Sequence, residues 1–416
     1  MAPKKAPAKS PTRISGGAHA STSAGNGAAR PAAKRPVNTA RGYKRPERLE
    51  DGYIIEDKTG KKTWRVGPVI GQGGFADVYL VSDKASKPVT EGTAKHVMKL
   101  EPSDNGPLYQ EVKFFKAAAK SDAIAAFLRE RSIKSLGIME YISSGVMEVN
   151  DKNLRWLILP RLDRNVQQIL DECDGIFSRQ CVILLALQLL DILEYIHKQG
   201  YAHADLKATN LMTGLSKTDA SQVYLIDFGL VKRFMDDNKH IPYKEEPKAA
   251  HDGTLELTST DAHKGAAPSR RGDLQILGFN LIKWLTGSLP WSDSTDPNFV
   301  RSQKITYFQN QSEFFRVAFP DGAPKEITDY FKAIRDLQYH DEPNYAKLRE
   351  IFQKASKDVK ARKSDLFATA SAAQESVDSA DSVPVPKKRA TRSAAVALSI
   401  GTSEAPPAKR GRKPKA

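Results

Sequence analysis

Apolar and polar positions divide the chain into an early part that predicts short strands and a later part that predicts helices. In the early part, short apolar runs are bounded by glycine and polar residues. A helical pattern extends from Pro107 to about Lys120. Its start is placed at Pro107 because proline suits the first turn of a helix. The predicted strands are residues 63–70, 78–81, 96–100 and 156–159.

Residues 179–199 are apolar on nearly every side, and a helix without a polar face belongs in a protein core. A strand over 223–226 and helical patterns over 273–287 and 327–354 follow. Strands first and helices afterwards predict an α+β fold, with a small β-rich lobe joined to a larger helical lobe.

The two ends of the chain lack such patterns. Residues 1–45 are rich in Ala, Pro, Gly, Ser and Lys, and residues 356–416 are rich in Ala, Ser, Asp and Lys. Neither segment has the apolar periodicity that burying a core requires. We therefore expect two disordered tails around a folded body of residues 46–355.

Charge follows the same division. Of the net charge of +15, residues 1–45 carry +10 and residues 384–416 carry +8, which leaves −3 for the rest. Basic tails favour polyanions such as nucleic acid, although a tail that only solubilises the protein has the same composition.

Three further features narrow the class of protein. We expect no transmembrane helix, because no run of 18 apolar residues occurs. We expect no secretory signal, because no apolar stretch follows the basic residues after Met1. Cys173 and Cys181 are the only cysteines, which suits a reducing compartment and argues against a disulfide or a zinc site.

The strongest chemical signal is His-Ala-Asp-Leu-Lys-Ala-Thr-Asn at residues 203–210, followed by Asp-Phe-Gly at 227–229. Phosphoryl transfer needs a proton acceptor, a cation beside the phosphate and oxygen ligands for magnesium. Asp205 would take the proton of the acceptor hydroxyl, and Lys207 would neutralise the γ-phosphate. The predicted ligands of Mg²⁺, or alternatively Mn²⁺, are Asn210 and Asp227.

A glycine-rich turn between two predicted strands would hold the phosphates of ATP. Glycines let backbone N–H groups approach phosphate oxygens without a Cβ in the way. The same glycines could mark a simple hairpin, and Ala76 stands where a third glycine is usual. The predicted nucleotide-binding residues of this turn are Ile70, Gly71, Gln72, Gly73, Gly74, Phe75, Ala76, Asp77 and Val78.

Lys99 ends the third predicted strand, and an apolar setting for a lysine calls for a partner. Glu111 is the only acidic residue between Pro107 and Lys120, so we predict a Lys99–Glu111 ion pair that positions the α- and β-phosphates. The alternative is a surface lysine whose stem lies along the strand.

By these motifs the chain resembles the eukaryotic protein kinases. The run His-Asp-Gly-Thr-Leu-Glu-Leu-Thr-Ser at 251–259 and the Ser-Arg-Arg-Gly-Asp run at 269–273 resemble the casein-kinase-1 group. Within that group the chain is most similar to the vaccinia-related kinases, of the nucleosomal histone kinase type. The supporting segments are residues 107–111, 201–203, 244–248 and 286–291.

The resemblance implies a bilobal kinase fold and a monomeric, nuclear, chromatin-associated serine/threonine kinase, with some of it in the cytoplasm as an alternative. Family substrates are histones and the barrier-to-autointegration factor, a DNA-bridging protein of the nuclear envelope. Family roles are chromatin condensation, nuclear envelope dynamics, mitosis and meiosis. It also implies that adenine bonds to the carbonyl of Pro160 and the N–H of Leu162.

Ala204 departs from the general kinase pattern, because an arginine usually precedes the catalytic Asp. That arginine commonly binds a phosphate on the activation loop, so we predict activity without activation-loop phosphorylation. Ala76 and Ala204 also support an alternative, a pseudokinase scaffold that binds chromatin through its tails. A third possibility is a DNA-binding protein in which the kinase body is secondary.

The tails carry two short basic motifs. Residues 384–389, Pro-Val-Pro-Lys-Lys-Arg, resemble a nuclear localisation signal. Residues 409–414 contain an Arg-Gly-Arg core that resembles an AT-hook, which lies in the narrow minor groove of A·T-rich DNA. A membrane-anchored form would need an apolar C-terminal helix, and residues 394–400 are too short for one.

Overall fold

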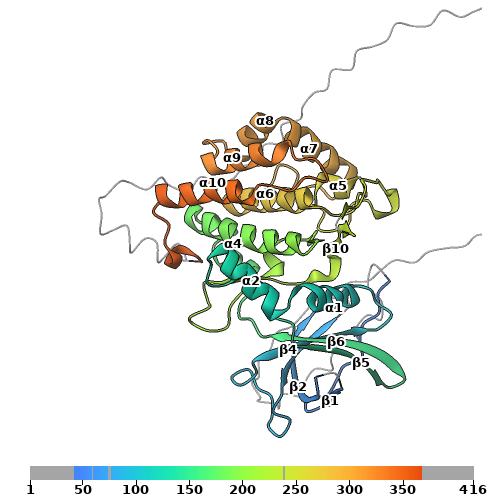
Figure 1. Ribbon diagram of the computed structural model, residues 1–416. Helices are drawn as coiled ribbons and strands as arrows, with labels where there is room; N and C mark the ends of the chain where they lie inside the picture. The colour runs from blue at the N-terminus through green and yellow to red at the C-terminus, as the bar shows by residue number, and fades with distance from the viewer. Residues whose placement is uncertain (1–41, 59, 74–75, 238, 368–416) are drawn as a thin grey trace, which may run out of the picture.

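The computed structural model describes residues 42–367, apart from 59, 74, 75 and 238. It shows a sheet-based lobe and a larger helical lobe, as the order of predicted strands and helices indicates (Figure 1). Two predicted nucleotide-binding residues, Gly74 and Phe75, lie outside the described residues. So do the basic motifs at 384–389 and 409–414.

The small lobe is built on one six-stranded antiparallel sheet, in the order β1-β2-β3-β4-β6-β5. Each central strand places apolar side chains on a core that includes Trp64, Tyr79 and Trp156. The strands are β1 (Ile54–Asp57), β2 (Lys62–Gln72), β3 (Asp77–Ser82), β4 (His96–Pro102), β5 (Ser143–Val149) and β6 (Lys152–Pro160).

The four predicted strands correspond to β2, β3, β4 and β6, and β1 and β5 were missed. These two are the edge strands of the sheet. Each buries only part of one face, and β5 begins Ser-Ser-Gly, so neither has the continuous apolar run that a central strand shows.

The helical lobe is organised around α4 (Arg179–Lys198), which is buried on most sides, with a half-buried stripe at Leu184, Leu187, Gln188 and Asp191. Ser178 caps its start by accepting a hydrogen bond from the Cys181 amide. Its length and hydropathy would also suit a membrane span, but 72% of that stretch is buried inside the protein, as in a core helix. Packing against α6 and α10 accounts for this burial.

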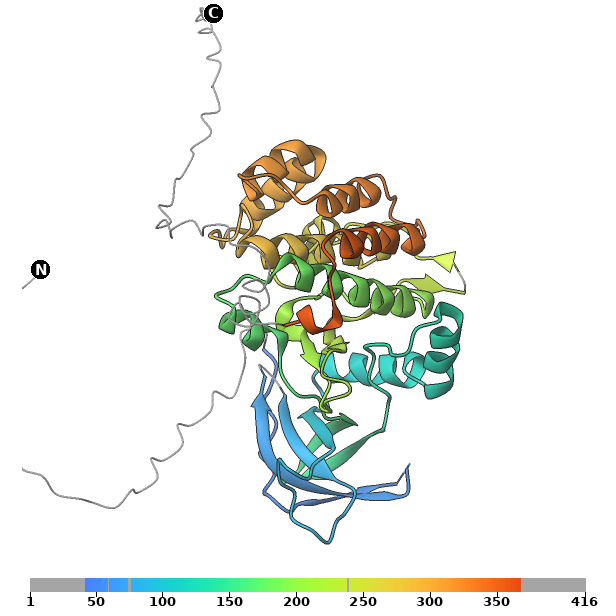
Figure 2. The ribbon, with the colours of Figure 1, turned by 90° about the vertical axis from the view of Figure 1, so that its left-hand side faces the viewer.

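The remaining helices cover α4 or join the two lobes. Helices α1 and α2 lie between the sheet and the helical lobe in both views (Figure 1, Figure 2). The bounds are α1 (Pro107–Ala118), α2 (Ser121–Arg131), α3 (Val166–Glu172), α5 (Thr260–His263), α6 (Arg270–Thr286), α7 (Pro297–Gln309), α8 (Gln311–Ala318), α9 (Lys325–Arg335) and α10 (Tyr345–Asp358).

Within the described residues, six short strands that follow α4 in the chain form three antiparallel pairs. The strands are β7 (Tyr201–Ala202), β8 (Leu211–Thr213), β9 (Val223–Leu225), β10 (Lys232–Arg233), β11 (Met235–Asp236) and β12 (Lys239–His240). Single 3₁₀ turns are η1 (Ala208–Asn210), η2 (Phe228–Leu230), η3 (Pro247–Ala249) and η4 (Lys363–Asp365).

The helix predictions were right in type and less accurate in extent. The pattern over 327–354 is two helices, α9 and α10, separated by a segment that contains Pro343. Helices α2, α3, α5, α7 and α8 were not predicted. Within α7 only Val300 and Lys304 are buried, so its sequence carries little apolar periodicity.

Candidate active site

The predicted catalytic loop, residues 203–210, is held by a carboxylate of α6. The backbone N–H groups of His203 and Ala204 donate to the two oxygens of Asp273, at 2.7 and 2.8 Å. Ala204 has φ +70°, a conformation that side-chain-bearing residues rarely adopt. The paired bonds from buried Asp273 hold the loop in this shape and so place the residues that follow it.

Asp205 lies at the centre of a cluster of polar side chains. The Lys207 Nζ is 2.7 Å from one carboxylate oxygen of Asp205, and the Thr254 hydroxyl donates to the other at 2.7 Å. Lys207 also donates to the Thr254 hydroxyl at 2.9 Å, which closes a triangle. The side-chain amide of Asn210 donates to the Asp205 carbonyl at 2.8 Å. The orientation of Asp205 is therefore set from three sides.

Lys99 joins the two lobes across the cleft. Its Nζ donates to Glu111 on α1 at 2.7 Å and to Asp227 at 2.9 Å, so the predicted Lys99–Glu111 pair is present. Burial lowers the pKa of Lys99, but the carboxylates of Asp227 and Glu111 outweigh it and the net pKa is raised. Lys99 in turn lowers the pKa of Asp227. Both groups are charged near neutral pH.

Phe228 packs helix α1 against the catalytic loop. Its ring stacks on Phe114 with centroids 4.0 Å apart and meets the edge of His203 at 4.9 Å. The Phe228 amide also donates to Glu111 at 3.4 Å. These contacts tie the position of Glu111 to that of the Asp-Phe-Gly segment, as an assembled phosphate site requires.

Asn210 and Asp227 fit the role of magnesium ligands by the chemistry of their donors. The Asn210 amide nitrogen bonds to Asp205, which leaves its carbonyl oxygen for a cation. Asp227 is held ionised by Lys99. Mg²⁺ is commonly bound by one or two protein oxygens together with substrate phosphates. Within the described residues no cluster of three or more His, Cys, Asp or Glu forms an all-protein metal cage.

The predicted nucleotide loop is the turn between β2 and β3. The Gly73 amide donates to the Ala76 carbonyl at 2.9 Å, and Gly71 lies opposite Val78 in the strand pairing. Val78 in turn pairs with Lys99 on β4, so these two residues lie side by side. Exposed Ile70, together with Gln72 and Asp77, completes the described part of this turn.

The predicted hinge lies where β6 ends. Pro160 is the last residue of β6, and buried Leu162 follows it two positions later. The intervening Arg161 amide donates to the Lys95 carbonyl at 2.9 Å, which ties this segment to the start of β4. Both predicted adenine contacts therefore stand at the junction of the two lobes.

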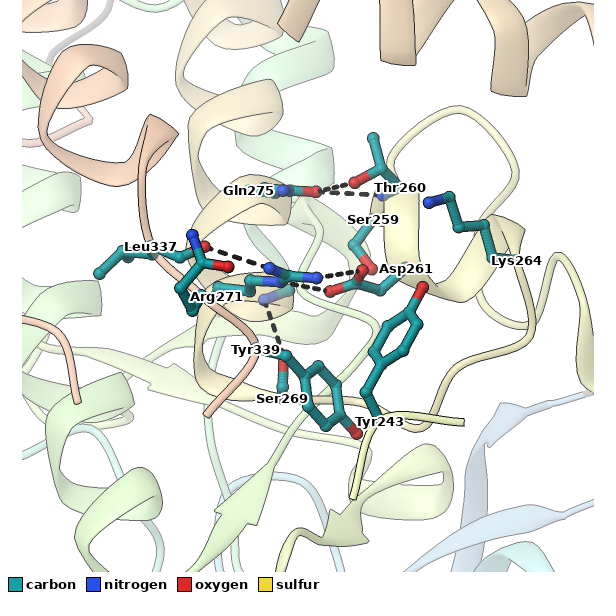
Figure 3. Close-up of polar contacts among 12 residues, drawn as sticks. Tyr243, Ser259, Thr260, Asp261, Lys264, Ser269, Arg271, Gln275, Leu337 and Tyr339 are labelled. Atoms are coloured by element: carbon teal, nitrogen blue, oxygen red, sulfur yellow. Dashed lines mark hydrogen bonds and ion pairs between the residues drawn. The ribbon is translucent and has the colours of Figure 1, made fainter. Parts of the chain in front are cut away.

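An ion pair between α6 and α5 fixes the segment that follows Thr254 in the chain (Figure 3). Two guanidinium nitrogens of Arg271 on α6 donate to the two oxygens of Asp261 on α5, both at 2.8 Å. A third donates to the Leu337 carbonyl at 3.1 Å, and the Tyr339 ring lies 5.6 Å from the guanidinium carbon. This bidentate geometry is specific to arginine and fixes α5 on α6.

Sequence reasoning assigned no role to Thr254 or Asp273, although both lie in runs that carry the family resemblance. It also missed Lys304 on α7, which donates to the carbonyls of Leu255 and Thr258 at 2.8 and 2.7 Å. The only signal for Lys304 was a lysine in a weakly amphipathic stretch. Its burial comes from packing between α6 and the 255–258 segment.

This fold and the geometry of its cleft define the class as protein kinases, and the family model for the protein kinase domain matches residues 64–354. Nucleosomal histone kinase 1 of Drosophila melanogaster is 39% identical over 76% of this chain and 52% of that protein. Serine/threonine-protein kinase VRK2 of Homo sapiens is 38% identical over 74% of this chain and 60% of that protein. The chain thus spans about half to three-fifths of these two relatives.

B1 kinase of Vaccinia virus (strain Western Reserve) is 33% identical over 72% of this chain and 96% of its own length. The solved structure of vaccinia related kinase 3 covers 78% of this chain and 95% of its own, with TM-score 0.67 and 30% identity. The chain belongs to the vaccinia-related kinases, a family of serine/threonine protein kinases. The predicted fold and family are confirmed.

Proposed function

We propose that this kinase transfers the γ-phosphate of ATP to serine or threonine residues of chromatin proteins, with histones as the first candidates. The observation that carries phosphoryl transfer is the cluster at Asp205. Its carboxylate lies 2.7 Å from both Lys207 and Thr254. The same residues line one cavity with Asp227.

Each residue of the cluster has a role that follows from its position. Asp205 orients the acceptor hydroxyl and takes its proton as the new phosphate ester forms. Lys207, held beside Asp205, offsets negative charge on the phosphoryl group in transfer. Lys99, held by Glu111, binds the α- and β-phosphates from the small lobe.

The remaining proposed sites are those for the metal ion and for the adenine of ATP. Mg²⁺, with Mn²⁺ as an alternative, supplies charge neutralisation of the phosphates when bound, and Asn210 and Asp227 hold it. The glycine turn from Ile70 to Val78 covers the phosphates, and Pro160 and Leu162 receive the adenine. We propose residues 46–355 as the kinase domain that carries these sites.

The choice of chromatin substrates rests on two supports. A relative at 39% identity is named nucleosomal histone kinase 1. Residues 1–45 and 384–416 carry +10 and +8, so they attract the DNA phosphates of a nucleosome. We further propose nuclear, chromatin-associated localisation with a cytoplasmic fraction, a monomeric enzyme, and the DNA-bridging nuclear envelope factor as a second substrate. No membrane association is proposed.

The test is radiolabelled phosphate transfer from ATP to nucleosomes and to free histones. Wild type is compared with Asp227→Ala, and with Asp329→Ala as a control on the outer face of α9, whose carboxylate pairs with Lys325. We expect transfer by wild type and by the control, and none by Asp227→Ala. A preference for nucleosomes over free histones supports the proposed role of the basic tails.

Two results would redirect the function. Nucleosome binding without any transfer by wild type would support the pseudokinase scaffold. The second result combines two observations: wild type transfers phosphate normally, and the Asp205→Asn variant retains full biological function in cells. Together they would support a DNA-binding protein whose kinase body is secondary.

A further inference from the structure

Lys304 on α7 is a lysine whose side chain is fully buried in the helical lobe, and the phosphoryl-transfer chemistry proposed above does not use it. The rings of Phe279 and Trp291 lie 5.4 and 5.6 Å from its Nζ. Burial lowers the pKa of Lys304 to about 6, and the carboxylate of Glu256 pairs with Lys283 instead. A polar group in such a position calls for hydrogen-bond partners, because burying it without them is costly.

The partners of Lys304 lie in residues 252–258, here called the threonine turn, and in the helix that follows them. The Lys304 Nζ donates to the Leu255 carbonyl at 2.8 Å and to the Thr258 carbonyl at 2.7 Å. It also lies 3.1 Å from Nε2 of His263 on α5. An amine has two N–H groups even when it is neutral, so both carbonyls have a donor whether or not the lysine is charged.

Hydrogen bonds within the threonine turn connect its two ends. The Thr254 carbonyl accepts from the amides of Leu257 and Thr258, both at 2.8 Å. The Thr258 hydroxyl donates to the Asp252 carbonyl at 2.7 Å. Because residues 254 and 258 are bonded to each other, the position of the Thr258 backbone constrains the position of Thr254.

The threonine turn also packs against the predicted catalytic loop. Gly253 has φ +97°, and a Cβ added there would lie 3.2 Å from the Ala204 carbonyl oxygen, so the two backbones approach closely. The next residue, Thr254, donates to Asp205 at 2.7 Å and accepts from Lys207 at 2.9 Å. A small shift of the turn would therefore change the contacts of Asp205.

We propose that Lys304 is a positioning residue for phosphoryl transfer, an inference that rests on the proposed function. By holding the carbonyls of Leu255 and Thr258, it fixes the backbone that carries Thr254. Thr254 in turn orients Asp205, the proposed acceptor of the hydroxyl proton. Lys304 touches neither the acceptor nor the nucleotide in this scheme, and it affects the rate only through the placement of Thr254.

The experiment is a double-mutant cycle between Lys304→Met and Thr254→Val, measured as histone phosphorylation by the full chain. Methionine keeps an apolar stem of similar length and removes the N–H donors. We expect Lys304→Met to lower kcat about tenfold and to change KM for ATP less than about twofold, because its contacts lie in the helical lobe. In the Thr254→Val background the same substitution should lower kcat less than about twofold, because the contact through which it acts is already lost.

Two further variants separate positioning from a general loss of stability. Val300→Ala, one turn earlier on α7 and also buried, leaves a cavity but does not remove the donors to the two carbonyls. It should lower the melting temperature and change kcat less than about twofold. Lys304→Gln retains two N–H donors on a shorter side chain, so its kcat should lie between those of wild type and Lys304→Met. It replaces Lys304→Met in the cycle if the methionine variant does not fold.

The outcomes separate this inference from the proposed function. A folded Lys304→Met enzyme with the kcat of wild type overturns the positioning role and leaves the kinase activity intact. An equal fold-loss from Lys304→Met with and without Thr254→Val also overturns it, because the lysine then does not act through Thr254. A loss of kcat in Val300→Ala as large as that in Lys304→Met does the same. Absence of transfer by wild type overturns the proposed function and this inference with it.

Discussion

Asp273 and Ala204, 69 positions apart in sequence, are joined by a 2.8 Å hydrogen bond from the Ala204 amide to the Asp273 carboxylate. The second carboxylate oxygen accepts from the His203 amide at 2.7 Å and lies 2.9 Å from His197. One buried side chain therefore connects the catalytic loop to two helices of the large lobe. In this way α6 determines the position of Asp205, which follows Ala204 directly.

Asp273→Asn is expected to lower the free energy of unfolding by about 2–3 kcal/mol and to reduce kcat. The amide keeps one oxygen but places an N–H₂ group against a backbone N–H, and buried unsatisfied donors are expensive. Urea unfolding and steady-state kinetics on a peptide measure both effects. Asp329→Asn, in an exposed ion pair of α9, is the control and should change stability by less than about 1 kcal/mol. Unchanged stability of Asp273→Asn would contradict this role.

Thr254→Val is expected to lower kcat about 10- to 100-fold with little loss of stability. Valine has nearly the shape of threonine, but it cannot donate to Asp205 or accept from Lys207. Small displacements of a catalytic group reduce the rate steeply. Thr254→Ser keeps the hydroxyl and should retain most of the activity. A valine variant with wild-type kcat would show that the triangle is not needed for catalysis.

Dephosphorylated enzyme is expected to keep most of its activity. Ala204 provides no guanidinium for a phosphate on the activation loop, and the Lys99–Glu111 pair and the Phe228 stack are present in the unmodified chain. The measurement compares kcat on histones before and after phosphatase treatment, with mass spectrometry to verify complete removal. Loss of nearly all activity after treatment would refute the prediction.

Glu101→Gln is expected to stabilise the protein above neutral pH. Burial raises the pKa of Glu101 to about 7, from an ordinary value of 4.5. The folded state therefore holds a proton that the unfolded state releases between about pH 4.5 and 7, and the free energy of unfolding falls as pH rises through this window. Above pH 7 Glu101 is ionised in both states, and the cost of burying its charge lowers the free energy of unfolding by about 3 kcal/mol.

Glutamine avoids this penalty because it stays neutral, and its oxygen can still accept from the Leu108 amide, as Glu101 does at 3.2 Å. Urea unfolding at pH 5 and pH 8 should show a larger gain at pH 8 than at pH 5. Glu148→Gln, at an exposed position of β5, is the control and should show equal effects at both values. An equal effect of Glu101→Gln at the two pH values would contradict the prediction.

Much of the fold was predictable from local pattern. Central strands β2, β3, β4 and β6 carry apolar runs because they supply the core of the small lobe, and α4 is largely apolar because α6 and α10 pack against it. The edge strands β1 and β5 and the helix α7 were missed. They bury little, so their sequences carry little periodicity.

The sequence by itself determined which residues could carry out phosphoryl transfer, because Asp205, Lys207, Asn210 and Asp227 fall within two short runs whose spacing is a local property of the chain. The tertiary structure decided how they are held. Thr254 and Asp273 act on residues 47 and 69 positions away. Such contacts leave no local pattern, because a hydrogen bond depends on a separation of about 3 Å in space and not on distance along the chain.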